Sequence, residues 1–108
     1  MAYDTFESKR LLLQTKLEEL LGNRNVYYQP SESINIRYPC IIYSLNPSYS
    51  AKADNQTYIY HYRFHLQHIF KDLTNSLIGE IPSQFRYSSF DNRNIVDSLY
   101  HDEYTVFF

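Results

Sequence analysis

The residues from Thr57 to Phe70 are the most constraining feature of this chain, because aromatic or apolar side chains alternate there with mostly polar ones. One set contains Tyr58, Tyr60, Tyr62, Phe64, Leu66, His68 and Phe70, and the other contains Thr57, Ile59, His61, Arg63, His65, Gln67 and Ile69. Successive side chains of a β-strand point to opposite faces of the sheet, so this period of two predicts a strand with one apolar face. At roughly 3.3 Å per residue the strand would span about 46 Å, far more than the usual five or six residues. We therefore expect part of it to extend past the sheet or to pair with a loop arm.

An amphipathic helix is predicted from about Thr5 to Leu21. Asp4 stands in the capping position and Glu7 follows three residues later, which is the pattern of a capping box. Gly22 is placed to end the helix in a left-handed conformation. The apolar positions that recur at helical spacing are Phe6, Leu13, Leu17, Leu20 and Leu21, and Leu11 and Leu12 widen this stripe. We expect the stripe to cover one face of a sheet; docking into the groove of a partner protein is the alternative.

The segment between this helix and the long strand predicts two further strands. Val26 to Gln29 forms a short strand that Pro30 stops. Tyr38 to Leu45 is apolar on both alternations, which is typical of a central strand covered on both faces or of a strand with one face in an interface. Asn46 to Gln56 is rich in Ser, Ala and Asn and has little to pack, so we expect an exposed connection.

The second half of the chain predicts one short helix and two or three strands. The expected elements are a short helix with Leu73, Leu77 and Ile78, capped by Asp72 and closed by Gly79 and Pro82, a strand at 85–90, a turn at 91–94, an ambiguous segment at 95–101 and a strand at 102–108. A chain of 108 residues has room for one domain and one core. The predicted fold is a single α+β domain, residues 1–108, with a mixed, mainly antiparallel sheet of four to five strands packed by the first helix and the short second helix.

Composition restricts the classes of function. The chain has 12 Tyr and 7 Phe, and aromatic rings with a polar tip suit half-buried sheets and protein interfaces, although strand propensity alone explains many of them. The net charge is −2 and the Lys and Arg residues are scattered, which argues against nucleic-acid binding. The single cysteine excludes an intramolecular disulfide, and the first residues lack an apolar signal core. We expect a protein that is made in the cytoplasm and does not enter a membrane.

Candidate catalytic and metal-binding residues are few. His61, His65 and His68 would share one face of a helix, but on a strand His61 and His65 lie roughly 13 Å apart and His68 points to the other face, which removes a zinc site. There is no G-x-S-x-G motif, and two glycines are too few for a phosphate-binding loop. Cys40 lies within an apolar strand and is expected to be a buried thiol. The sequence predicts no enzyme activity, no metal and no cofactor; an active site assembled from distant residues is the alternative.

Three stretches together resemble a known family. They are Gly22 to Pro30 (GNRNVYYQP), Arg37 to Tyr43 (RYPCIIY) and Leu99 to Phe108 (LYHDEYTVFF). Their order resembles the small neck proteins of tailed bacteriophages, of the tail terminator or tail-completion (head–tail joining) type. The resemblance implies a mixed sheet flanked by helices, six copies in a ring, and a place in the virion neck between the tail tube protein and the head-side connector. It also implies that genomic DNA passes through the ring without sequence-specific binding, and it supplies no catalytic residues.

The exposed connection and the long strand after it form a candidate arm for contacts between subunits. A head-to-tail ring needs two different patches on each subunit, and a strand with an open edge can supply one of them. The hypothesised interface residues are Tyr49, Lys52, Asp54, Asn55, Tyr58, Tyr60, His61, Arg63, Phe107 and Phe108. Two other functions fit the sequence: a different phage connector, head-completion or minor tail protein, and a small protein-binding module or enzyme unrelated to phages.

Overall fold

The computed structural model describes residues 6–31, 35–46 and 62–108, and it shows an α+β fold. The elements in chain order are α1 (Phe6–Leu21), β1 (Val26–Tyr28), β2 (Cys40–Leu45), β3 (Arg63–Phe70), the 3-10 helix η2 (Leu73–Asn75), α2 (Glu80–Gln84), β4 (Ser88–Val96) and β5 (Leu99–Phe107). Five strands form one sheet in the order β1-β2-β3-β5-β4. Strand β1 runs parallel to β2 and the other neighbours are antiparallel, so the predicted mixed, mainly antiparallel sheet is confirmed.

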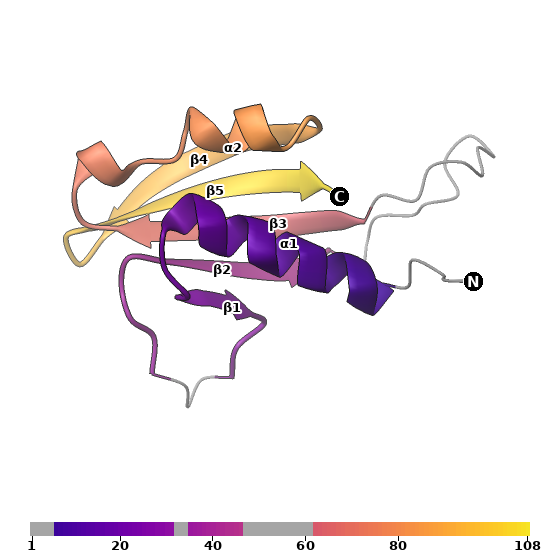
Figure 1. Ribbon diagram of the computed structural model, residues 1–108. Helices are drawn as coiled ribbons and strands as arrows, with labels where there is room; N and C mark the ends of the chain where they lie inside the picture. Colours follow the sequence, from indigo (N-terminus) through magenta and orange to yellow (C-terminus); the bar gives the residue numbers. More distant parts are fainter. Residues whose placement is uncertain (1–5, 32–34, 47–61) are drawn as a thin grey trace, which may run out of the picture.

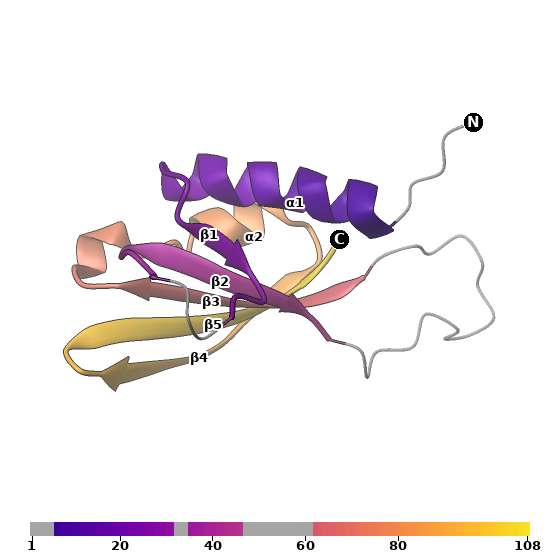
Figure 2. The same ribbon diagram turned by 90° about the horizontal axis from the view of Figure 1, so that it is seen from below.

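Both α-helices lie on the same face of the sheet (Figures 1 and 2). Helix α1 crosses above the middle strands, and α2 lies beside it over the β5 and β4 side (Figure 1). Leu13 and Leu17 of α1 are fully buried against the alternate residues Phe64 and Leu66 of β3, which belong to the same core cluster. The predicted covering role of this helix is therefore confirmed. The opposite face of the sheet carries no helix among the described residues (Figure 2).

Helix α1 begins and ends close to its predicted limits, but its apolar stripe is narrower than expected. Gly22 has a φ of +85° and its N–H donates to the Glu18 carbonyl at 2.9 Å, as predicted for a glycine that ends a helix. Leu11 and Leu12 point away from the sheet and are 50% and 58% exposed. At about 100° per residue, Leu11 and Leu12 each lie more than about 90° around the helix from a stripe centred on Leu13 and Leu17, so both turn away from the sheet. The capping residue Asp4 lies outside the described residues.

The long alternating strand is confirmed over its second half. Strand β3 begins at Arg63, and Tyr62 precedes it while exchanging two backbone hydrogen bonds with Phe108, at 2.7 and 2.9 Å. Residues 57–61 lie outside the described residues, so the predicted extension past the sheet stays a prediction. The apolar alternation has its expected result, because Phe64, Leu66, His68 and Phe70 are all buried.

The segment after β3 differs from the prediction. Asp72 does cap a helix, since its side chain accepts the Thr74 N–H at 3.0 Å, but this 3-10 helix has three residues and excludes Leu77 and Ile78. Gly79 precedes α2 instead of ending a helix, and Pro82 is the third residue of α2. Proline is tolerated there because the amides of the first helical turn have no partner within the helix.

The predicted turn at 91–94 is wrong. These residues lie inside β4, which starts at Ser88, and a β-bulge between Phe90 and Asn92 makes Asp91 the additional residue. The chain reverses at Asp97 and Ser98, whose φ values of +53° and +66° match a two-residue hairpin turn. The polar run at 91–94 resembled a turn because β4 is an edge strand whose residues face solvent.

Candidate assembly interface

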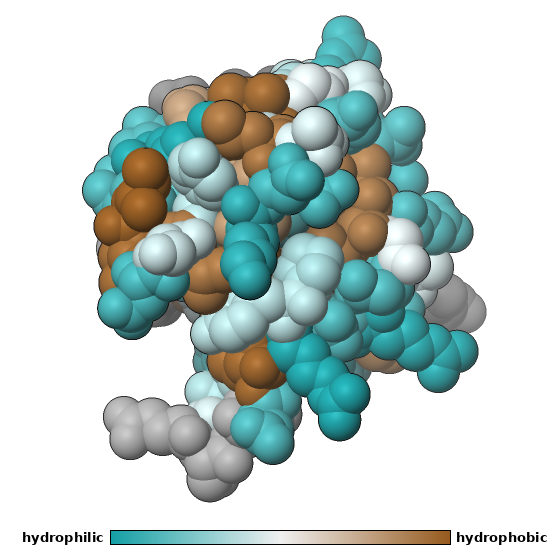
Figure 3. Space-filling model, turned by 90° about the vertical axis from the view of Figure 1, so that its left-hand side faces the viewer, coloured by the Kyte–Doolittle hydropathy of each residue, from teal (hydrophilic) through white to brown (hydrophobic). Residues whose placement is uncertain are grey.

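Strand β4 is an exposed edge of the sheet. It pairs with β5 on one side, and on the other side no described strand pairs with it. Seen from the end of the sheet that carries the β4–β5 hairpin, the surface shows hydrophobic patches separated by hydrophilic side chains (Figure 3). Phe90, Ile95 and Val96 of β4 are exposed apolar residues, and Ile95 is 65% exposed. A strand edge of this kind presents backbone N–H and C=O groups to which another chain can pair.

The charged side chains of β4 are engaged within the molecule. Arg93 binds the fully buried Asp102 through two hydrogen bonds, Nε to Oδ1 at 2.6 Å and Nη2 to Oδ2 at 2.7 Å. Asp91 accepts hydrogen bonds from the hydroxyls of Thr105 at 2.6 Å and Ser89 at 3.0 Å. In many edge strands, unpaired charged side chains oppose pairing with another chain, and neither Asp91 nor Arg93 is free to do so. The bulge at Phe90 and Asn92 divides the edge into two shorter segments.

The opposite edge of the sheet is short and partly covered. Strand β1 has three residues, and the backbone oxygen of Val26 accepts a hydrogen bond from Gln14 Nε2 of α1 at 2.9 Å. The two edges therefore differ, and β4 offers the longer surface for pairing with another chain. Pairing of β4 with the β4 edge of a second copy would be isologous, whereas pairing with a different surface of a neighbour would be the head-to-tail contact that a ring requires.

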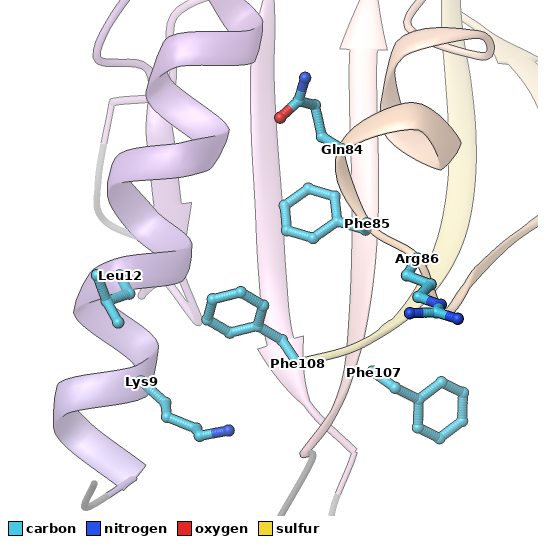
Figure 4. Close-up of a pocket in the computed structure, with 7 residues that line it drawn as sticks. All are labelled: Lys9, Leu12, Gln84, Phe85, Arg86, Phe107 and Phe108. Atoms are coloured by element: carbon cyan, nitrogen blue, oxygen red, sulfur yellow. The ribbon is translucent and has the colours of Figure 1, made fainter.

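A groove lies beside the last residues of β5 (Figure 4). It has a volume of about 350 Å³ and is lined by Lys9, Leu12, Gln84, Phe85, Arg86, Phe107 and Phe108. The rings of Phe85 and Phe108 pack edge to face with centroids 5.9 Å apart. Figure 4 shows Phe108 pointing toward α1, whereas Phe107 points away from it, on the side of Arg86.

The structure describes three of the ten predicted interface residues. Arg63 and Phe107 are cross-strand partners on the open face of the sheet, and Phe108 packs against the hydrophobic core. Phe108 therefore packs partly buried against its own subunit, and Phe107 is also partly buried but on the open face. The remaining predicted residues, Tyr49, Lys52, Asp54, Asn55, Tyr58, Tyr60 and His61, lie outside the described residues.

The histidines of β3 lie on opposite faces, as the alternation predicts. His65 lies on the open face, with Nε2 3.7 Å from Glu103 Oε1. His68 lies on the helix side, where it is 1% exposed, and burial lowers its pKa to about 4. In the part of the chain that the structure describes, no group of three or more His, Cys, Asp or Glu side chains is arranged to hold a metal. Cys40 is fully buried and burial raises its pKa to about 12, so its thiol stays protonated.

Sequence reasoning missed the ion pair between Arg93 and Asp102. Arg93 was assigned to a turn and Asp102 to the start of a strand, so nothing placed them opposite one another. A signal was present, because a hairpin centred on Asp97 and Ser98 brings residues 93 and 102 into register. The pair anchors the edge strand β4 to the buried side of β5.

Comparison with protein-family models, curated proteins and solved structures found no match to this chain. Among the described residues, no helix is long and apolar enough to cross a membrane. A functional conclusion therefore depends on the chain's own residues and their geometry.

Proposed function

We propose that this protein is a structural subunit that assembles into a ring, as a tail terminator that caps the tail tube of a bacteriophage and joins it to the head-side connector. The observation that carries the assembly role is the edge of β4, which has nine residues in two segments separated by the bulge at Asp91 and has its charges engaged within the subunit. The bacteriophage setting rests on the resemblance of the segments at 22–30, 37–43 and 99–108 to neck proteins.

A second contact surface is expected at the connection between β2 and β3. Leu45 pairs with Phe64, so this connection starts and ends at neighbouring positions on one end of the sheet (Figure 1). Most of the connection, residues 47–61, lies outside the described residues, so its contact with an adjacent subunit stays a prediction. The proposed ring joins the β4 edge and this connection to different neighbours, as head-to-tail assembly requires.

The expected partners are further copies of this chain, six in the ring, together with the tail tube protein and the head-side connector. Genomic DNA would pass through the ring without specific binding, which agrees with a net charge of −2 and scattered basic residues. The protein would be made in the host cytoplasm and act in the neck of the virion. No catalytic role forms part of this proposal.

The variant Ile95→Lys tests the edge, because a lysine on an edge strand opposes pairing with another strand. Ile95 is 65% exposed, so we expect its free energy of unfolding to change by less than about 0.5 kcal/mol. Assembly on purified tail tubes, viewed by negative-stain electron microscopy, should be lost. Leu11→Lys on the outer side of α1, where Leu11 is 50% exposed, is the matched control and should assemble normally. Six-fold rings formed by Ile95→Lys as readily as by the wild type would refute the role of this edge.

Deletion of residues 50–55 tests the connection. The shortened chain should keep its circular dichroism spectrum and fail to join heads to tails in an in vitro complementation assay. A deletion variant that still joins heads to tails would contradict the hypothesis that this connection contacts an adjacent subunit. The genomic setting is a separate check, since genes for a portal, a connector and a major tail protein should lie nearby.

A further inference from the structure

The groove of Figure 4 combines positive charge with apolar rings on one small surface. Its walls come from the first half of α1, from the connection between α2 and β4, and from the end of β5. Three parts of the chain that are distant in sequence therefore build it. Two backbone hydrogen bonds between Phe108 and Tyr62, at 2.7 and 2.9 Å, hold the end of β5 beside the start of β3 and fix the position of Phe108 in the groove.

The lining side chains carry two positive charges and no negative one. Lys9 Nζ lies 5.9 Å from the centre of the Phe108 ring, and Arg86 Cζ lies 5.6 Å from the centre of the Tyr87 ring. Two other arginines are paired with carboxylates, Arg10 with Glu7 and Arg93 with Asp102. No carboxylate of the described residues pairs with Arg86, in a chain whose net charge is −2. Arg86 is thus an exposed guanidinium next to a groove without acidic side chains.

The apolar part of the lining is accessible from outside. Leu12 is 58% exposed although it borders the groove, and Phe108, which points toward α1 (Figure 4), is only partly buried. Phe85 is buried and packs edge to face on Phe108, which keeps both rings in place. Arginine and aromatic residues contribute most to binding energy in protein interfaces, where rigid rings lose little conformational freedom.

We infer that this groove binds an acidic peptide segment of a partner protein, which places carboxylates near Lys9 and Arg86 and one large apolar side chain against Leu12 and the Phe108 ring. A volume of about 350 Å³ is enough for one large side chain and part of a backbone, at the low end of ligand sites. Charge complementarity selects the acidic partner and orients it, and apolar contact adds affinity. Two cations are too few for a nucleic-acid backbone, which binding proteins usually meet with a larger basic surface. The inference is independent of the ring, since it concerns the surface of one subunit.

Fluorescence polarisation with a labelled pentapeptide, Asp-Glu-Phe-Asp-Leu, tests the groove on the full chain. Two control peptides separate the contributions: Asn-Gln-Phe-Asn-Leu lacks the charge, and Asp-Glu-Ser-Asp-Ser lacks the apolar side chains. The first peptide should bind most tightly, and its affinity should fall as salt is raised. Arg86→Gln should weaken its binding about two- to five-fold, the effect of one exposed charge pair. Arg24→Gln, which removes an exposed arginine outside the groove, should leave binding unchanged.

A second pair of variants tests the apolar contact. Leu12→Ser should weaken binding of Asp-Glu-Phe-Asp-Leu, whereas Leu11→Ser should not, because Leu11 is equally exposed but does not line the groove. Equal binding of the charged and neutral peptides, or equal effects of Arg86→Gln and Arg24→Gln, would overturn the inference. The inference is also overturned if none of the peptides binds and sedimentation velocity shows that the chain self-associates in a way that Arg86→Gln abolishes. The groove would then be occupied by a second copy of this chain. Ile95→Lys separates this inference from the ring, because that variant should bind the peptide as the wild type does.

Discussion

Acidification should destabilise this protein through His68. His68 is 1% exposed, its ring stacks on Phe70 with centroids 4.4 Å apart, and neither ring nitrogen has a hydrogen-bond partner among the described residues. Burial lowers its pKa from 6.5 to about 4; the carboxylate of Asp102 opposes this shift, and the guanidinium of Arg93 adds to it. Glu80 lines the same cavity, of about 300 Å³, on the side of α2. The imidazole is therefore neutral in the folded protein at neutral pH.

The sign of the effect follows from the direction of the pKa shift. A histidine with a lower pKa in the folded state takes up its proton more readily in the unfolded chain, so its stabilising contribution is complete above pH 6.5 and is lost as the pH falls toward 4. The lowering of the His68 pKa from 6.5 to about 4 corresponds to about 3 kcal/mol. About 2 kcal/mol of this loss falls between pH 7 and pH 4.5. The free energy of unfolding of a domain is typically about 5–15 kcal/mol, so a change of this size is readily measured.

Urea unfolding followed by circular dichroism at pH 7 and pH 4.5 measures the effect. The wild type should lose about 2 kcal/mol more than His68→Gln over this interval, because glutamine does not titrate. Carboxylates titrate in both proteins, so the difference isolates His68. His65→Gln is the matched control on the open face, where the side chain is 43% exposed, and it should lose stability as the wild type does. An equal loss in all three proteins would refute a buried, neutral His68.

Two further changes test the structure by urea unfolding. Arg93→Met should lower the free energy of unfolding by about 3–5 kcal/mol, because it leaves the fully buried Asp102 carboxylate without its partner. Arg86→Met, which replaces an exposed arginine, should have little effect. Similar losses in both variants would contradict the ion pair between Arg93 and the buried Asp102. Gly22→Ala should lower the free energy of unfolding by about 1 kcal/mol because its φ is +85°. Gly79→Ala should not, because its φ is −92°, and an added Cβ would meet no atom within 4 Å at either position. Equal effects would show that the backbone conformation at Gly22 is not the cause.

The assembly interface stays a prediction, but the positions of two of its residues follow from the sequence pattern. Arg63 and Phe107 belong to the outward-facing sets of their strands, and they are cross-strand neighbours on the open face of the sheet. The open edge of β4 was missed, because polar residues at 91–94 have the composition of a turn as well as that of a solvent-facing edge strand. The groove could not be predicted either, since Lys9, Arg86 and Phe108 belong to segments that only the folded chain brings together.

The sequence by itself determined the local features of this protein. The alternation at 63–70 produced a strand with a buried face, the spacing of Leu13 and Leu17 produced a covering helix, and Gly22 ended that helix. Each of these depends on the positions of side chains along one segment and on the conformations that one residue allows. Only the tertiary structure decided the strand order and the neutral state of His68. Those features depend on which distant segments lie side by side and on how much water they exclude, and no local pattern encodes either.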